Sequence, residues 1–155
     1  MKYKLKFLLK TAEDHRSLIP RILVGLIFLS EGIQKLLFPE TVGAARFERI
    51  GFANPEFLAA FVAYFEIVCG FLVLTGFAVR ISSLPLLIII GTAIIKTKIP
   101  ILLNEGFWKM AHEARTDFAM TLLIVFLLIY GAGKLSIDYR LQGKLRPNGS
   151  QVPLR

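Results

Sequence analysis

Four long apolar runs, separated by short polar connections, dominate the pattern of this chain. The longest run covers residues 57–79, and its only charged residue, Glu66, falls close to the middle. A helix needs about 20 apolar residues to cross the ~30 Å hydrocarbon core of a bilayer. Shorter runs reach this length when flanking lysines extend toward the head groups. The pattern therefore predicts membrane-spanning helices over residues 18–38, 57–79, 81–99 and 117–134.

The composition supports this interpretation. Of the 155 residues, 55% are apolar and the mean hydropathy is +0.62, whereas soluble domains are only about 45–50% apolar even when glycine is counted. The formal net charge of +8 comes from Lys and Arg at the edges of the apolar runs, which is typical of topology signals and lipid contacts rather than nucleic-acid binding. We predict an all-α polytopic integral membrane protein, a four-transmembrane-helix bundle in contact with the lipid bilayer and with no nucleic-acid partner.

The distribution of Lys and Arg predicts the orientation. With four spans, one side of the membrane receives twelve of these residues and the other receives seven. The positive-inside rule then places both termini in the cytoplasm. Residues 1–17 are expected to be a basic cytoplasmic flank or a short amphipathic interfacial helix, residues 18–138 the membrane domain, and residues 139–155 a basic cytoplasmic tail.

The chain carries no sequence sign of a redox centre of its own. Cys69 is the only cysteine, so an intramolecular disulfide, a CxxC pair and an iron–sulfur ligand set are excluded. Its simplest interpretation is a small buried hydrophobic residue. The two histidines, His15 and His112, are expected on opposite sides of the membrane and cannot both bind one haem. We predict no metal site and no intrinsic cofactor.

The first predicted span carries charges on one side. At 100° per residue, Glu31 and Lys35 share a helical stripe with Arg21, and Gln34 lies at its edge. Glu31 and Lys35 form an i,i+4 pair in the favourable order. Because charged groups in a membrane helix face the bundle interior or a cavity, this stripe is predicted to point inward.

The depths of the two membrane glutamates coincide. Glu31 lies about 15 Å outward from Arg21, and Glu66 lies about 13.5 Å inward from Phe57, at 1.5 Å per residue. Both carboxyl groups therefore reach a similar level in the outer half of the bundle, with Lys96 and Asp117 nearer the rim. The predicted ligand-binding or proton-handling cluster consists of Glu31, Gln34, Lys35, Glu66, Lys96 and Asp117.

Purely structural roles remain open for these residues. Glu31 and Lys35 could neutralise each other as an internal ion pair. Glu66 could hydrogen-bond to a neighbouring helix or hold a proton, because two buried acids at one level repel when both are ionised. Lys96 and Asp117 could act only as interfacial anchors. No catalytic residue is identified.

A second polar set lies at the inner surface. Arg80 occupies the tight turn between the second and third spans, and Asp138 follows the fourth. We expect an Arg–Asp clamp that ties the helix ends together, with glycines that allow close approach of the last turn. The predicted clamp residues are Arg21, Arg80, Gly131, Gly133, Ser136 and Asp138.

Three segments in order resemble a known family. They are GLIFLSEGIQKL, FEIVCGFLVLTGFAVR and YGAGKLSID, and they are similar to segments of the DoxX family of small four-helix membrane proteins, over about Arg21 to Leu141. The acid, glycine and closing arginine of the second helix correspond to Glu66, Gly70 and Arg80. Asp117 departs from the pattern, which has a glutamate there.

The resemblance implies a four-helix bundle in a bacterial or archaeal inner membrane. Characterised relatives are membrane subunits of quinone-linked sulfur oxidoreductases or members of membrane-bound redox and detoxification complexes. Our leading hypothesis is accordingly an accessory subunit of an oxidoreductase complex that binds a quinone or another small molecule at the outer polar cluster. Lone catalysis is not expected, because electrons would need a partner subunit or the quinone itself.

Two alternatives use the same residues. A small proton-coupled exporter would also place a glutamate inside a compact bundle, and with four spans it would be expected to form a homo-oligomer. A non-catalytic assembly or adaptor protein would use the charged clusters only to hold its helices together.

Overall fold

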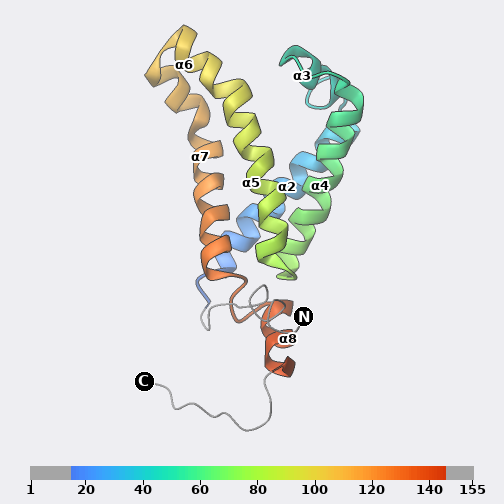
Figure 1. The fold of residues 1–155 in the computed structure, drawn as a ribbon, viewed down its shortest axis with the longest axis vertical. Coiled ribbons are helices and arrows are strands. Elements are labelled where there is room, and N and C mark those ends of the chain that lie inside the picture. The colour runs from blue at the N-terminus through green and yellow to red at the C-terminus, as the bar shows by residue number, and fades with distance from the viewer. Residues whose placement is uncertain (1–14, 146–155) are drawn as a thin grey trace.

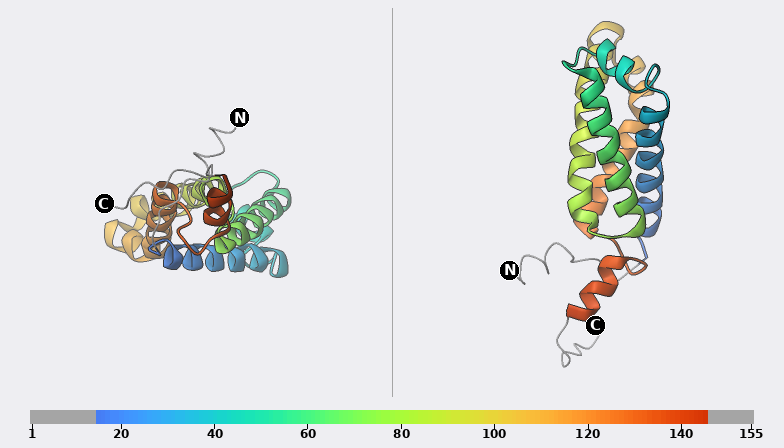
Figure 2. Two further views of the ribbon diagram at one scale, coloured as in Figure 1. Left: turned by 90° about the horizontal axis from the view of Figure 1, so that it is seen from below. Right: turned by 90° about the vertical axis from the view of Figure 1, so that its right-hand side faces the viewer.

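Helices make up all the regular structure in the described part of the chain. The computed structural model describes residues 15–145; the expected flank before residue 15 and most of the expected basic tail lie outside this range. The long helical segments of this part lie alongside one another (Figures 1 and 2). They are α2 (Leu18–Leu37), α4 (Pro55–Thr75), α5 (Val79–Ala93) with its continuation, and α7 (Phe107–Tyr130).

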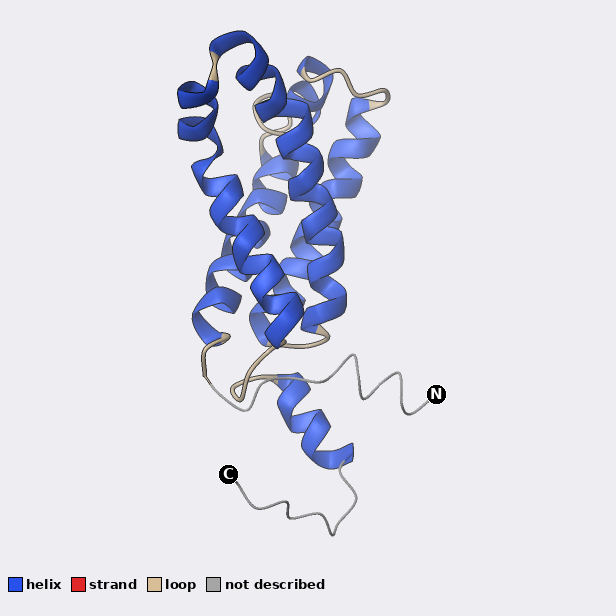
Figure 3. Cartoon of the chain, turned by 60° about the vertical axis from the view of Figure 1, so that its left-hand side comes forward, coloured by secondary structure: helices blue, strands red, loops and turns tan. Residues whose placement is uncertain are grey.

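Short helices connect or follow these segments. The π-helical segment η1 (Ile94–Lys98) and α6 (Ile99–Glu105) continue α5, and α3 (Ala44–Arg49) lies between α2 and α4. Helix α8 (Ile137–Leu145) projects below the long helices (Figure 3). Helix α2 is inclined behind the others, so that it starts near the lower end of α7 and ends beside the upper part of α4 (Figure 1).

The second helix ends earlier than the apolar run suggests. We expected a span to residue 79, but α4 stops at Thr75 and α5 begins at Val79. Gly76 has φ +75°, and the amide of Phe77 donates to the carbonyl of Leu72 at 2.9 Å. Glycine adopts this left-handed conformation without a steric penalty, so the backbone turns while the side chains stay apolar.

The connection before the last long helix is helical rather than a loop. We expected spans over residues 81–99 and 117–134, which left residues 100–116 as a connection, but α6 and the first ten residues of α7 occupy that stretch. Pro100 lies in the first turn of α6, where a missing amide donor is tolerated. Gly106, at φ +87°, reverses the chain within one residue.

The interface between α2 and α4 depends on glycines. A Cβ atom on Gly32 would lie 2.6 Å from the carbonyl oxygen of Ala63, and one on Gly25 would lie 2.7 Å from the Cβ of Leu74. A Cβ atom on Gly70 of α4 would lie 2.9 Å from the amide nitrogen of Leu29. Small residues let helix backbones approach one another in a membrane, so these glycines set the spacing of the two helices.

Replacing Gly32 with alanine is expected to lower the free energy of unfolding by about 1–3 kcal/mol, because the methyl group overpacks a rigid main-chain contact. Gly91 provides the matched control, since a Cβ there meets no atom within 4 Å. Gly91→Ala is expected to be neutral or stabilising by up to about 1 kcal/mol through helix propensity. Thermal unfolding of both variants in detergent, followed by circular dichroism, makes the comparison. Equal melting of Gly32→Ala and the parent protein would contradict the close contact.

Among the described residues, two helices are long and apolar enough to cross a membrane. They are α4 and the continuous segment Val79–Glu105. Helices α2 and α7 have the length, but every stretch of 18 residues within them contains at least three charged residues. Large apolar side chains on the outside of α4, such as Phe57, Tyr64 and Phe71, are exposed, as expected for a helix that faces lipid.

Candidate functional site

Arg21 ties three parts of the chain together at the lower end of the long helices. Its side chain is buried, and its guanidinium donates to the carbonyl oxygens of Val73 at 3.1 Å and Leu74 at 3.2 Å, at the end of α4. It also donates to Ala132 and Leu135, both at 2.8 Å, after α7. One side chain from α2 thus satisfies four main-chain acceptors at the ends of other helices.

Asp138 fixes the turn between α4 and α5. Its carboxylate accepts hydrogen bonds from the amides of Ala78 at 2.7 Å and Val79 at 3.0 Å, and its own amide donates to the carbonyl of Gly76 at 2.9 Å. Burial raises the pKa of the Asp138 carboxyl, while the two amide hydrogen bonds and the charge of Arg21 act in the opposite direction. Asp138 therefore caps the start of α5 from a distant part of the sequence.

The remaining residues of the predicted clamp lie at the same end. Arg80 donates to the carbonyl of Ile129 at 2.6 Å. The hydroxyl of Ser136 donates to the carbonyl of Gly133 and accepts from the amide of Tyr139 at 3.1 Å. Gly131 and Gly133 have positive φ angles. We expected an Arg–Asp clamp. Within the described residues, the hydrogen bonds of Arg21 and Asp138 go to main-chain groups instead. Helix ends expose carbonyls and amides that have no partner within their own helix, and these two side chains bind such groups.

Lys35 and two glutamates form a compact charged group between α2 and α4. The Lys35 Nζ atom lies 2.8 Å from Glu66 Oε2 and 3.3 Å from Glu31 Oε2. The side chains of Lys35 and Glu66 are only 9% and 4% exposed, whereas Glu31 is 47% exposed. The buried pair is consequently Lys35–Glu66, and Glu31 is the member that solvent or a ligand can reach.

Asp117 pairs with a lysine that the sequence analysis did not select. Lys98 Nζ lies 3.3 Å from Asp117 Oδ2, whereas Lys96 lies over the ring of Phe52, 5.4 Å from its centroid. The two lysines belong to η1, whose wider turn changes the direction of the side chains that follow α5. Lys98 is therefore the lysine that faces the polar region.

Gln34 does not join the charged group. Its amide donates to the hydroxyl of Ser30 at 2.9 Å on an exposed part of α2. The structure brings together Glu31, Lys35 and Glu66 at one place and Lys98 and Asp117 at another, and it places Gln34 and Lys96 outside both groups.

Both charged groups line one cavity of about 510 Å³. Its walls come from α2, α3, α4, α5, η1 and α7, toward the end where the α2–α4 pair and the α5–α7 pair diverge (Figure 1). Most of the lining is apolar, including Phe28, Phe61 and Ile89. The charged lining residues are Glu31, Lys35, Arg46, Glu66, Lys98, Glu113 and Asp117.

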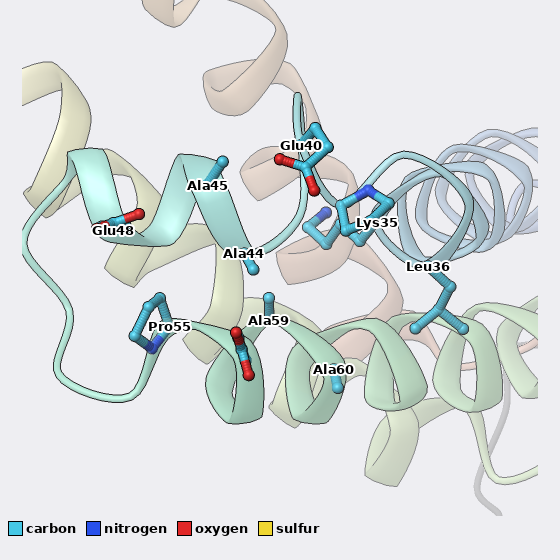
Figure 4. A pocket seen from close by; sticks show the side chains of 11 residues that line it. Lys35, Leu36, Glu40, Ala44, Ala45, Glu48, Pro55, Ala59 and Ala60 are labelled. Atoms are coloured by element: carbon cyan, nitrogen blue, oxygen red, sulfur yellow. The ribbon is translucent and has the colours of Figure 1, made fainter.

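A second pocket, of about 470 Å³, lies on the other side of Lys35. Figure 4 shows Lys35 of α2 on one side of it and Glu48 of α3 on the other, with Ala59 and Ala60 of α4 below. Lys35 lines both this pocket and the cavity. Lys35 is thus shared by the two hollows, whereas its partner Glu66 lines only the larger one.

The cavity contains the elements of a ligand site. Ligand pockets in proteins are typically about 300–1,000 Å³, mostly apolar, with a few polar groups that orient the ligand. Lys35 and Lys98 can donate hydrogen bonds to a carbonyl or anionic oxygen, and Glu31 can accept or release a proton. Within residues 15–145, no group of three or more His, Cys, Asp and Glu side chains is arranged to hold a metal ion.

Comparison with known proteins gives three findings. The DoxX family model matches residues 17–98. The "Uncharacterized membrane protein Rv3486" of Mycobacterium tuberculosis is 47% identical over 137 residues, which cover 84% of each chain. The "Putative oxidoreductase CatD" of Bacillus subtilis is 32% identical over 138 residues, covering 86% of this chain and 93% of that protein.

No solved structure gives a significant match. The family model nevertheless spans more than half of the sequence, and it includes α2, α4 and α5 with Glu31, Lys35 and Glu66. The two relatives extend the similarity over most of the chain, and the first of them is named as a membrane protein. This chain is a membrane protein that belongs to the DoxX family.

Proposed function

We propose that this DoxX protein binds a quinone, or a small molecule of similar shape, in the cavity between its two helix pairs and acts as a membrane subunit of an oxidoreductase complex. The observation that carries the proposal is a mainly apolar cavity of about 510 Å³ with the buried Lys35–Glu66 pair in its wall. The name of the relative "Putative oxidoreductase CatD" is consistent with it.

The residues present fit a quinone head group. Its ring would be held by apolar side chains such as Phe28 and Phe61, and its carbonyl oxygens would accept hydrogen bonds from Lys35 or Lys98. Glu31, the more exposed acid, would exchange protons with the surroundings, while Glu66 keeps Lys35 in place. A bound quinone would exchange electrons with a partner subunit. We propose no intrinsic cofactor for this protein.

We further propose that α2, α4, α5 with its continuation, and α7 all span the inner membrane as a bundle, with both termini in the cytoplasm. The excess of Lys and Arg on one side, twelve against seven, supports this orientation. Two of the three charges of α2 are shielded by other helices: Arg21 is buried, and Lys35 is paired with Glu66, while the third, Glu31, lines the cavity. Charges shielded in this way are compatible with a membrane span.

Replacing Glu66 with glutamine is expected to abolish quinone binding without preventing folding. The change removes the carboxylate that holds Lys35, while Glu31 still pairs with the lysine and keeps its charge compensated. The protein is purified in native-lipid particles, and co-purifying quinones and proteins are identified by mass spectrometry. Glu56→Gln is the matched control, because Glu56 belongs to the same helix but lines the second pocket instead of the cavity.

The expected result is quinone enriched over bulk lipid in the parent protein and in Glu56→Gln, and lost in Glu66→Gln. Enrichment that survives in Glu66→Gln would remove Glu66 from the site. No enrichment in any sample would contradict quinone binding; it would favour the exporter if drug resistance of the cells depended on the protein, and the adaptor otherwise.

A further inference from the structure

Helix α3 presents different faces to the two cavities. Arg46 and Phe47, with Ile50 and Phe52 just after the helix, line the cavity of about 510 Å³. Ala44, Ala45 and Glu48 line the second pocket, as Figure 4 shows. The other arginine of the helix does neither: Arg49 donates to the carbonyl of Thr41 at 2.9 Å. A helix of six residues thus separates the two cavities and directs one arginine to the mouth of the larger one.

Arg46 differs from the other cations of the cavity wall. Lys35 lies 2.8 Å from Glu66, and Lys98 lies 3.3 Å from Asp117, so each already has a carboxylate partner. The guanidinium of Arg46 has no hydrogen bond or ion pair to any described residue, and this exposed residue lines the cavity. Arginine presents a planar set of N–H donors that matches an anionic oxygen, and such charge-assisted bonds are stronger than neutral ones.

Aromatic side chains flank Arg46. The ring centroids of Phe47 and Phe52 lie 5.4 Å apart, the angle between the ring planes is 35°, and both residues line the cavity. The Nζ atom of Lys96 lies over the ring of Phe52, 5.4 Å from the ring centroid. This contact links the segment after α3 to η1. An aromatic ligand therefore meets an aromatic surface immediately beside the unpaired guanidinium.

The other charges of the cavity wall influence which end of a ligand enters. Apart from Glu113, which is exposed and lies 3.6 Å from Lys109, the carboxylates of Glu31, Glu66 and Asp117 line the cavity, against two cations other than Arg46, Lys35 and Lys98. With these five groups ionised they carry a net charge of −1, which disfavours an anion beside them. An acidic head group is favoured at the mouth, beside Arg46, with its apolar part inside.

We propose that Arg46 is the anion-binding residue of the cavity, and that the preferred ligands are aromatic amphiphiles with an ionised oxygen, such as a hydroxynaphthoquinone in its deprotonated form. The proposal rests on the ligand cavity of the proposed function and specifies the ligand class. Arg46 holds the anionic oxygen, Phe47 and Phe52 contact the ring, and the apolar lining takes the rest of the molecule.

The experiment compares two naphthoquinones that differ in charge. Lawsone, a hydroxynaphthoquinone, is an anion at neutral pH, and menadione, a methylnaphthoquinone, is neutral. Binding of each to the full chain in phosphatidylcholine discs is measured by equilibrium dialysis, with empty discs to subtract partition into lipid. The variants are Arg46→Gln, Arg46→Lys and, as the matched control on the same helix, Arg49→Gln.

The parent protein is expected to bind lawsone more tightly than menadione. Arg46→Gln should weaken lawsone binding about tenfold, the size of one charge-assisted hydrogen bond, and leave menadione binding unchanged. Arg46→Lys should give a smaller loss for lawsone alone, and Arg49→Gln no loss. Helix α3 has no buried residues, so these variants should fold; thermal unfolding checks this, and Arg46→Lys replaces Arg46→Gln if the latter is unstable.

Three results would overturn the proposal. Unchanged lawsone binding in the Arg46 variants would remove Arg46 from the site, and equal losses for both probes would show a structural effect instead of anion recognition. Binding of menadione but not lawsone to the parent protein would refute the ligand class and leave the proposed function standing. If neither probe binds, the proposed function fails together with this inference.

Discussion

Arg21→Met is expected to give the largest loss of stability of any single substitution described. The methionine fills similar space but cannot donate, so the carbonyls of Leu74, Ala132 and Leu135 lose the Arg21 donor, while that of Val73 keeps only the amide of Gly76 at 3.1 Å. An unsatisfied buried acceptor costs about 1–3 kcal/mol. Allowing for water that reaches this end of the helices, we expect a total of about 4 kcal/mol, a large part of the ~5–15 kcal/mol that stabilises a typical domain.

The loss is measured by thermal unfolding in detergent and by the fraction of monodisperse protein in size-exclusion chromatography. Arg21→Lys keeps the charge but presents one compact donor group, so it should fall between the parent and Arg21→Met. Arg49→Met is the control, because Arg49 makes one exposed hydrogen bond to the carbonyl of Thr41, and its loss should be within about 1 kcal/mol. Similar melting of Arg21→Met and Arg49→Met would show that the Arg21 contacts do not stabilise the fold.

Lys35→Met is expected to be the second most damaging substitution. Lys35 is 9% exposed and lies 2.8 Å from the 4% exposed Glu66. Removing one partner of a buried pair leaves an uncompensated charge and typically costs about 3–5 kcal/mol. Glu31 contributes less to this cost, because solvent reaches its half-exposed carboxylate.

A second change tests whether the uncompensated charge is the cause. The double variant Lys35→Met/Glu66→Gln has no buried charge at this place, so it should be more stable than Lys35→Met alone. Lys109→Met, which breaks the exposed i,i+4 pair with Glu113 at 3.6 Å, should cost no more than about 1 kcal/mol. A double variant that melts below Lys35→Met would contradict this explanation. Unfolding is followed by circular dichroism for all three proteins.

Much of the helical structure was predictable from local patterns. The α2 helix, Leu18–Leu37, nearly coincides with the expected first span, because Pro39 cannot continue a helix. The face of α4 that carries Glu66 is buried, including Ala63 and Gly70, since the helical period places small residues beside the acid. The number of spans and their orientation remain predictions.

The exact ends of helices were less predictable. The apolar run through residue 79 hides the turn at Gly76, because the turn requires a left-handed backbone and not a polar side chain. Conversely, the polar residues before Asp117 placed the expected start of the last span at residue 117, although Lys109 and His112 already lie on α7. Hydropathy reports the environment of a side chain and not its backbone conformation.

The candidate site shows the same division. Glu31 and Lys35 are one helical turn apart, so their proximity followed from the sequence, and the estimated depths of Glu31 and Glu66 anticipated that both could approach one lysine. Lys98 was not selected, because the π-helical segment η1 changes the side-chain directions after Ala93. Arg46 was missed because it belongs to a short surface helix with no periodic signal of its own.

The sequence alone determined the class of molecule: an apolar, helical membrane protein of the DoxX family with acids and lysines inside its helical runs. Those properties depend on composition, on the 3.6-residue period and on motifs, all of which are local. Only the tertiary structure decided that Lys35 pairs with Glu66, that Lys98 and not Lys96 meets Asp117, and that Arg46 faces the cavity. Such contacts join helices far apart in the chain, and they depend on the tilt and spacing of helices set by glycine contacts and main-chain clamps.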